Sequence, residues 1–146
     1  MDEYRIVVDS REKKCLWHKN VIVKKLLVGD YSIEGYEDKI SIERKTIIDL
    51  YQTLTFGHKR FKKEISRGLK YDYFAILIIG SFKDVLNKNF KGSEHTRIKG
   101  ETIIKILFTI HLKYGIPVYF VSDWFEARVL VTYLFNSFLG FYNHKK

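Results

Sequence analysis

The segment Lys39–Lys45 reads KISIERK, and it is the clearest secondary-structure signal in the chain. Apolar and polar residues alternate along it, which is typical of a β-strand with one face against a core. Ile40 and Ile42 then point toward the core. Glu43 and Lys45 share the opposite face. The segment therefore predicts a strand that carries a carboxylate and an amine side by side.

Strands and helices are expected on both sides of this segment. Tyr4–Asp9 and Tyr73–Gly80 are rich in β-branched and apolar residues, which is typical of strands covered on both faces. Gly29–Asp30 is expected as a tight turn between two strands, and Gly35–Asp38 as a hairpin loop. The remaining expected elements are strands at 21–28, 31–33 and 118–121, helices at 46–56, 58–71, 101–113 and 123–141, and a short helix or turn at 81–89. This order predicts a single domain over residues 1–146, a three-layer α/β/α sandwich with a central mixed sheet.

The composition bounds the class of protein. A net charge of +9 on 146 residues favours a polyanionic partner, above all nucleic acid. The single cysteine, Cys15, cannot form an internal disulfide, and no Cys/His pair has zinc-ligand spacing, so we expect a reducing compartment. The most apolar stretch, 129–142, is shorter than the roughly 20 residues that a bilayer requires. No signal-peptide pattern opens the chain, and we expect a soluble intracellular protein.

Asp30 and Glu43 are separated by a hairpin, which brings both to one end of the predicted sheet. A hard cation such as magnesium is usually held by one or two carboxylates. A nearby lysine can stabilise negative charge or orient a water molecule. Asp30, Glu43 and Lys45 therefore fit the hydrolysis of a phosphodiester bond. The same spacing also fits a surface salt bridge between Glu43 and Lys45.

Three short elements appear in register along the chain. Asp9-Ser10-Arg11-Glu12 follows the first strand, Gly29-Asp30 opens the hairpin, and Glu43-Arg44-Lys45 with Asp49 closes it. Together they resemble the nuclease domain of the XPF family of structure-specific endonucleases, whose signature is V-D-x-R-E, then G-D, then E-R-K-x-x-x-D. The resemblance continues to Tyr114–Val121 and so covers nearly the whole chain. It implies a restriction-endonuclease-like fold of the PD-(D/E)XK type.

The resemblance also implies roles for the matching residues. Asp30 and Glu43 would bind a Mg²⁺ or Mn²⁺ ion, and Asp9 would complete the acidic cluster. Lys45 would position the attacking water. Arg44 and Asp49 would be needed for activity.

Several of these side chains have alternative roles. Strand alternation points Arg44 away from Glu43, so Arg44 either reaches the scissile phosphate through a bulge or pairs with Asp49. Asp49 by itself also fits a charge at a helix N-terminus. Arg11 and Glu12 either contact DNA and the metal shell or pair with each other.

The helix after Gly57 carries a run of basic side chains. A solvated charged face is the ordinary interpretation of such a run. Beside an active site, the same side chains suit phosphate contacts, which position a duplex without reading its sequence. The residues expected to bind DNA are Arg11, Lys59, Arg60, Lys62, Lys63 and Arg67.

The last helix is apolar on nearly every side between Trp124 and Tyr142. Such a helix must be buried all round. A homodimer interface would bury it, and XPF-family nuclease domains pair through their terminal helices. The alternative is a helix enclosed in its own core.

The resemblance implies a metal-dependent endonuclease that cuts branched DNA, such as flaps, forks or Holliday junctions, in repair or recombination. One alternative is a less selective DNA nuclease, and another is a non-catalytic DNA-binding scaffold subunit. The sequence contains no tandem helix-hairpin-helix domain, which many family members carry. The sequence does not identify which branched DNA structure is preferred, or whether a helicase or another repair partner contributes.

Overall fold

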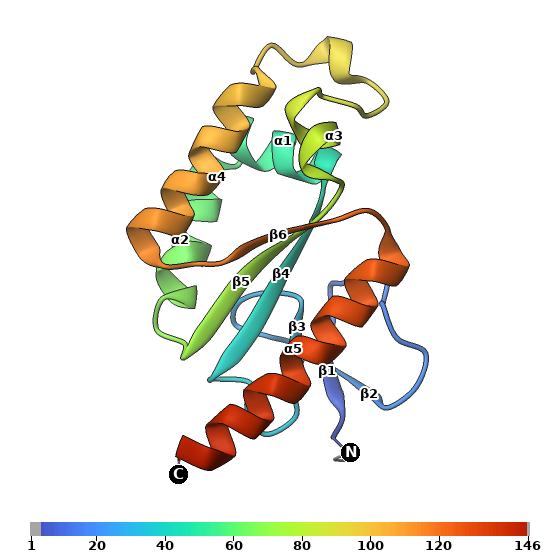
Figure 1. Cartoon of the computed structure of the whole chain (residues 1–146), viewed down its shortest axis with the longest axis vertical. Helices are drawn as coiled ribbons and strands as arrows, with labels where there is room; N and C mark the ends of the chain where they lie inside the picture. Colours follow the sequence, from blue (N-terminus) through green and yellow to red (C-terminus); the bar gives the residue numbers. More distant parts are fainter. Residues whose placement is uncertain (1–3, 146) are drawn as a thin grey trace.

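A six-stranded mixed sheet forms the centre of the molecule (Figure 1). The computed structural model describes residues 4–145, with side chains as far as residue 143. Residues 1–3 and 146 of the predicted domain lie outside this range. The strands lie in the order β2-β1-β3-β4-β5-β6. They are β1 (Ile6–Asp9), β2 (Val21–Lys24), β3 (Tyr31–Ile33), β4 (Ile40–Thr46), β5 (Tyr73–Ile79) and β6 (Val118–Val121).

The strand pairing confirms one predicted connection and corrects another. β3 and β4 are antiparallel neighbours, as a hairpin requires. β2 is not next to β3, however, because it pairs in parallel with the far side of β1. β2 also ends at Lys24 instead of Val28, since Leu26 and Val28 turn into the core, where they are 3% and 2% exposed. The turn at Gly29–Asp30 therefore joins strands on opposite sides of β1.

Helices cover both faces of the sheet, which confirms the three-layer prediction (Figure 1). On β5, Ile76 and Ile78 pack under α1, α2 and α4, whereas Ala75 and Leu77 pack under α5. This alternation explains why the strand is apolar throughout. The helices are α1 (Ile47–Thr55), α2 (His58–Gly68), α3 (Phe82–Leu86), α4 (Gly100–Tyr114) and α5 (Trp124–Lys145), with a 3₁₀ turn at Ser93–His95.

The end of β4 is also the start of α1. Thr46 is the last strand residue and the N-cap of the helix, and its hydroxyl accepts a hydrogen bond from the Asp49 N–H at 3.1 Å. The Asp49 carboxylate accepts in return from the Thr46 N–H, which completes the predicted capping box. The cap fixes where the strand stops, and so positions the polar residues just before it.

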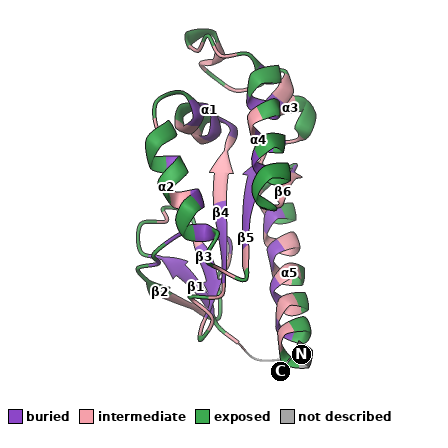
Figure 2. Ribbon diagram, turned by 90° about the vertical axis from the view of Figure 1, so that its left-hand side faces the viewer, coloured by how far each residue is buried: buried purple, intermediate pink, exposed green. Residues whose placement is uncertain are grey.

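α5 is buried along one stripe and not all round. Ala127, Val131 and Phe135 recur every four residues and are fully buried against the sheet. Phe125 and Tyr133 on the helix are 64% and 70% exposed. Figure 2 shows the buried side of α5 turned toward the strands and the exposed side turned away. The prediction of burial on every side is therefore wrong for the isolated chain.

None of the helices in the described range 4–145 combines the length and the apolarity needed to cross a membrane.

Candidate active site

The turn before β3 holds Asp30 against β4. The Asp30 N–H donates to the Ile42 carbonyl, and the Asp30 carboxylate accepts from the Arg44 N–H, both at 2.8 Å. Gly29 has a φ of +79°, and a Cβ there would lie 2.0 Å from the Ser41 hydroxyl oxygen. Only glycine permits this approach. Gly29 therefore allows the turn to approach β4 closely, and Asp30 forms the hydrogen bonds that hold it there.

β4 presents Glu43 and Lys45 toward α2, whereas Ile40 and Ile42 join the core under α5. The Lys45 Nζ lies 3.2 Å from the Glu43 carboxylate and 5.9 Å from the ring centroid of Phe61 on α2. The Lys45 and Glu43 side chains are only 17% and 8% exposed. The alternation predicted for this strand is confirmed. The alternative of a surface salt bridge is wrong, because the ion pair is largely buried.

Glu64 of α2 joins this cluster, and the sequence pattern did not indicate it. Its carboxyl group hydrogen-bonds with that of Glu43 and lies close enough to Asp30 to repel it. Glu64 is the single acidic residue on α2, whose sequence is HKRFKKEISRG. A lone carboxylate in a basic helix, three residues from the buried Phe61, is the signal that could have identified it.

Burial and mutual repulsion penalise the ionised carboxylates. Burial, followed by the charge of Glu43, raises the pKa of Asp30 to about 8. Burial and the charge of Glu64 raise the pKa of Glu43, although Lys45 opposes this shift. A divalent cation between Asp30 and Glu43 would remove the repulsion. Carboxylate oxygens are the donors that Mg²⁺ and Mn²⁺ prefer, so this donor set fits such an ion.

Asp9, at the end of β1, already has protein donors around its carboxylate. It accepts from the Leu26 N–H at 2.7 Å and from the Arg11 Nε at 2.9 Å. Burial opposes ionisation, but these hydrogen bonds hold the pKa of Asp9 below its ordinary value. Within residues 4–145, no three acidic, histidine or cysteine side chains lie in metal-binding geometry. The structure thus brings Asp30 and Glu43 together and does not join Asp9 to them.

Arg44 lies on the opposite face of β4, under α5. Its Nε donates to the Glu12 carboxylate at 2.7 Å, and the same carboxylate accepts from the Tyr31 hydroxyl at 2.6 Å. The guanidinium carbon lies 4.7 Å from the ring centroid of Trp124. This network ties the start of α5 and the segment after β1 to the strand that carries the site.

Two pairings that the sequence left open are wrong. Asp49 belongs to the capping box of α1 instead of pairing with Arg44. Arg11 binds Asp9, and Glu12 binds Arg44, so Arg11 and Glu12 do not pair with each other. The Glu12 partner of Arg44 is 32 residues away and is not visible in local spacing, whereas the Asp9 partner of Arg11 is only two residues away and competed with the equally local Glu12.

The basic side chains of α2 divide between two of its faces. Arg60, Glu64 and Arg67 are spaced i, i+4 and i+7, so they share the face toward the carboxylates. Lys62 lines a groove between α2 and α4 instead. Every basic residue predicted to bind DNA is exposed to solvent: Arg11, Lys59, Arg60, Lys62, Lys63 and Arg67.

A mixed sheet sandwiched by helices, with a turn carboxylate beside a strand carboxylate and its lysine, defines a restriction-endonuclease-like nuclease fold. The chain belongs to the ERCC4 domain family, whose model matches residues 8–134. This confirms the resemblance to XPF-family nuclease domains.

Two solved structures show the same architecture. XPF from Aeropyrum pernix superposes with a TM-score of 0.68 and 25% identity, over 90% of this chain and 63% of that chain. XPF from Aeropyrum pernix in complex with DNA gives 0.68 and 24%, over 91% and 64%. This chain therefore spans slightly less than two thirds of either solved chain. No curated protein sequence matches significantly.

Proposed function

We propose that this chain is a divalent-metal-dependent endonuclease that hydrolyses phosphodiester bonds at branched DNA, in repair or recombination. The observation that carries the proposal is the grouping of Asp30, Glu43 and Lys45 at one end of the sheet, where Glu43 is buried, Asp30 and Lys45 are half-buried and the two carboxylates repel each other. Membership of the ERCC4 domain family supports it. So does the likeness to XPF, one structure of which is a complex with DNA. Residues 1–146 would act as one nuclease domain.

Asp30 and Glu43 would hold a Mg²⁺ or Mn²⁺ ion. Such an ion polarises the scissile phosphate and activates water. Lys45, held against Glu43, would orient the attacking water and stabilise the charge that develops on the phosphate. Glu64 would set the orientation of the Glu43 carboxyl group through their hydrogen bond.

Arg11 would contact a backbone phosphate beside the site. Its guanidinium is anchored by Asp9 yet 65% exposed, so it is oriented and still accessible. Arg60 and Arg67 would extend the contact along α2. Because such contacts release counterions, DNA affinity should fall steeply with salt.

Arg44 and Asp49 would support the site without entering it. Arg44 holds one face of β4 through Glu12, and Asp49 holds the start of α1. Loss of either would displace Glu43 and Lys45, because Arg44 lies between them on β4 and Asp49 caps the helix through Thr46, the residue after Lys45.

We also infer that α5 forms a homodimer interface. Phe125 and Tyr133 of α5 leave large aromatic surfaces exposed to solvent. Self-association would bury them. A two-fold pair of sites suits symmetric cutting of a junction.

The substrate class is tested with labelled fork, 3′-flap, four-way junction and linear duplex DNA, in magnesium, manganese or EDTA. We expect metal-dependent nicking of the branched substrates only, lost in Asp30→Asn and Glu43→Gln. Equal cutting of linear DNA would favour the less selective nuclease. Tight DNA binding without cleavage in either metal would favour the scaffold subunit.

A further inference from the structure

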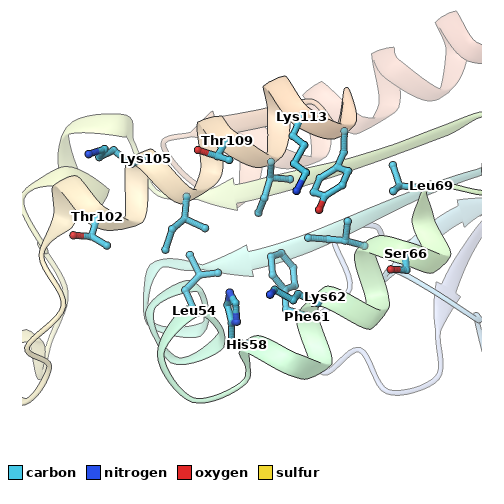
Figure 3. A pocket seen from close by; sticks show the side chains of 14 residues that line it. Leu54, His58, Phe61, Lys62, Ser66, Leu69, Thr102, Lys105, Thr109 and Lys113 are labelled. Carbon is cyan, nitrogen blue, oxygen red and sulfur yellow. The ribbon is translucent and has the colours of Figure 1, made fainter.

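A groove of about 520 Å³ lies between α2 and α4, on the side of the sheet away from α5 (Figure 3). Its volume is within the roughly 300–1,000 Å³ of ligand sites in proteins. His58 and Thr102 lie at one end of the groove, and Leu69 and Lys113 at the other (Figure 3). The carboxylates of the candidate active site do not line it.

The two walls of the groove share one helical spacing. The α4 wall follows the pattern i, i+3, i+4, i+7, i+8, i+11, with Thr102, Lys105, Ile106, Thr109, Ile110 and Lys113. The α2 wall repeats the same pattern from His58 to Leu69. A stripe with this spacing is the face that one helix packs against another. At 1.5 Å per residue each stripe is about 17 Å long, so the groove has the shape to receive a third helix.

The floor of the groove is apolar and its rim is basic. Phe61, Ile65 and Ile110 form the floor, where they are 4%, 5% and 7% exposed. Lys105 and Lys113 stand exposed on the α4 wall. The lining residues, all within the described part of the chain, include no aspartate or glutamate. The groove therefore complements a ligand with an apolar face and negative charges beside it.

A nucleic acid strand fits this lining less well than a peptide. Single-stranded nucleic acids bind by stacking bases on exposed aromatic rings. Phe61 is buried in the floor, so Tyr114, 39% exposed, is the single exposed phenylalanine, tyrosine or tryptophan ring among the described lining residues, and the Lys113 ammonium lies 5.2 Å from its centroid. One such ring does not provide the succession of stacking surfaces that such a strand uses. The remaining apolar lining is aliphatic, which suits leucine or isoleucine anchors.

We propose that the groove between α2 and α4 binds an acidic amphipathic helix of a partner protein. Aliphatic side chains of that helix contact Ile65, Ile106 and Ile110, and its carboxylates contact Lys105 and Lys113. The groove is separate from the carboxylates of the candidate active site, and it shares Lys62 with the residues predicted to bind DNA. The proposal does not depend on nuclease activity. Because α2 borders both the groove and these carboxylates, the bound partner lies beside the DNA-cutting site.

The test is selection from a displayed library of random peptides of about 16 residues, long enough for an isolated helix. Wild-type protein is the bait. Peptides that also bind the Lys105→Glu/Lys113→Glu variant are discarded, because they bind outside the groove or without its lysines. We expect selected peptides to carry aliphatic residues at i, i+3, i+4 and i+7 with an excess of aspartate and glutamate. Synthetic copies should bind the double variant at least about tenfold more weakly than wild type.

The matched control is Lys83→Glu/Lys99→Glu, which makes the same charge change at exposed lysines outside the groove. It should keep wild-type peptide affinity, and both variants should unfold at the wild-type temperature. Failure to enrich any peptide over the double variant would overturn the proposal. Selected peptides without acidic residues would also overturn it. If Lys105→Glu/Lys113→Glu lowered DNA affinity by as much as peptide affinity, the groove would be assigned to nucleic acid and the proposal would be overturned.

Discussion

Asp30 is half-buried and Glu43 is buried beside it, and ionising either carboxyl group in the metal-free protein is opposed in two ways. Desolvation comes first, and the charge of a neighbouring carboxylate second: Glu43 acts on Asp30, and Glu64 acts on Glu43. A cation would bind the deprotonated carboxylates, so its binding would release protons and depend on pH. The arrangement that disfavours ionised carboxylates without a metal would therefore also favour binding of a cation.

This arrangement predicts how stability depends on pH in the metal-free protein. The folded-state pKa of Asp30, about 8, is above its unfolded value, so the proton stabilises the folded state. Stability from this group is present in acid and is lost as pH rises toward 8. We expect Asp30→Asn, whose amide oxygen still accepts from the Arg44 N–H, to raise stability at pH 9 by about 1–3 kcal/mol.

Urea unfolding in EDTA at pH 5 and pH 9 measures this effect. At pH 5 the folded-state Asp30 keeps its proton and only the unfolded chain ionises there, so the gain from Asp30→Asn should be much smaller than at pH 9. If Asp30→Asn were equally stabilised at both pH values, or destabilised at pH 9, then ionising Asp30 would not destabilise the folded protein.

Part of the site follows from local spacing and part does not. Asp30, Glu43 and Lys45 were predictable, because a hairpin and strand alternation are enough to bring them together. Glu64 is marked in the sequence only as the lone carboxylate of a basic helix, and its approach to Glu43 depends on how α2 packs over β4. The Glu12 partner of Arg44 was missed for the same reason.

At the scale of elements, β4 separates two polar networks. Glu43 and Lys45 face α2, whereas Arg44 faces α5 and pairs with Glu12. The Arg44 and Glu12 side chains are 11% and 4% exposed. A pair this far from water is destabilising to break, because the remaining charge is left buried.

Single and double substitutions of this pair should therefore not be additive. Arg44→Ala and Glu12→Ala should each lower the free energy of unfolding by about 3–5 kcal/mol. The double variant should lose clearly less than the sum, because it leaves no unpaired charge. Denaturant unfolding of the four proteins measures the coupling, with Glu12→Gln as a milder replacement. Additive losses would mean that the two side chains do not stabilise each other.

The types of most elements were predictable, but two placements were not. Alternation identified β4, and the apolar character of the segments identified β5 and α4. The position of β2 beyond β1 arises from parallel pairing, which leaves no mark on local sequence. The single buried stripe of α5 was hidden because apolar residues also occupy its outer face.

At the scale of the whole molecule, the outer face of α5 predicts self-association. We expect the mass in solution to be that of a dimer. Phe125→Glu/Tyr133→Glu should shift it to a monomer, because both side chains are largely exposed and contribute little to the core of one chain. Multi-angle light scattering measures the mass.

The control for this experiment is Phe56→Glu, at an aromatic side chain that is 88% exposed near the end of α1. It should leave the mass unchanged. A wild-type monomer at all accessible concentrations would contradict the dimer. So would a dimer that survives the double substitution on α5.

If Asp30, Glu43 and Lys45 form a working phosphodiesterase site, the protein should turn over an excess of labelled fork DNA in magnesium. We predict many cleavage events per protein molecule, none in EDTA, and a loss of about a hundredfold or more in Glu43→Gln with DNA affinity retained. Cleavage by Glu43→Gln at the wild-type rate, or cleavage unaffected by EDTA, would contradict the account.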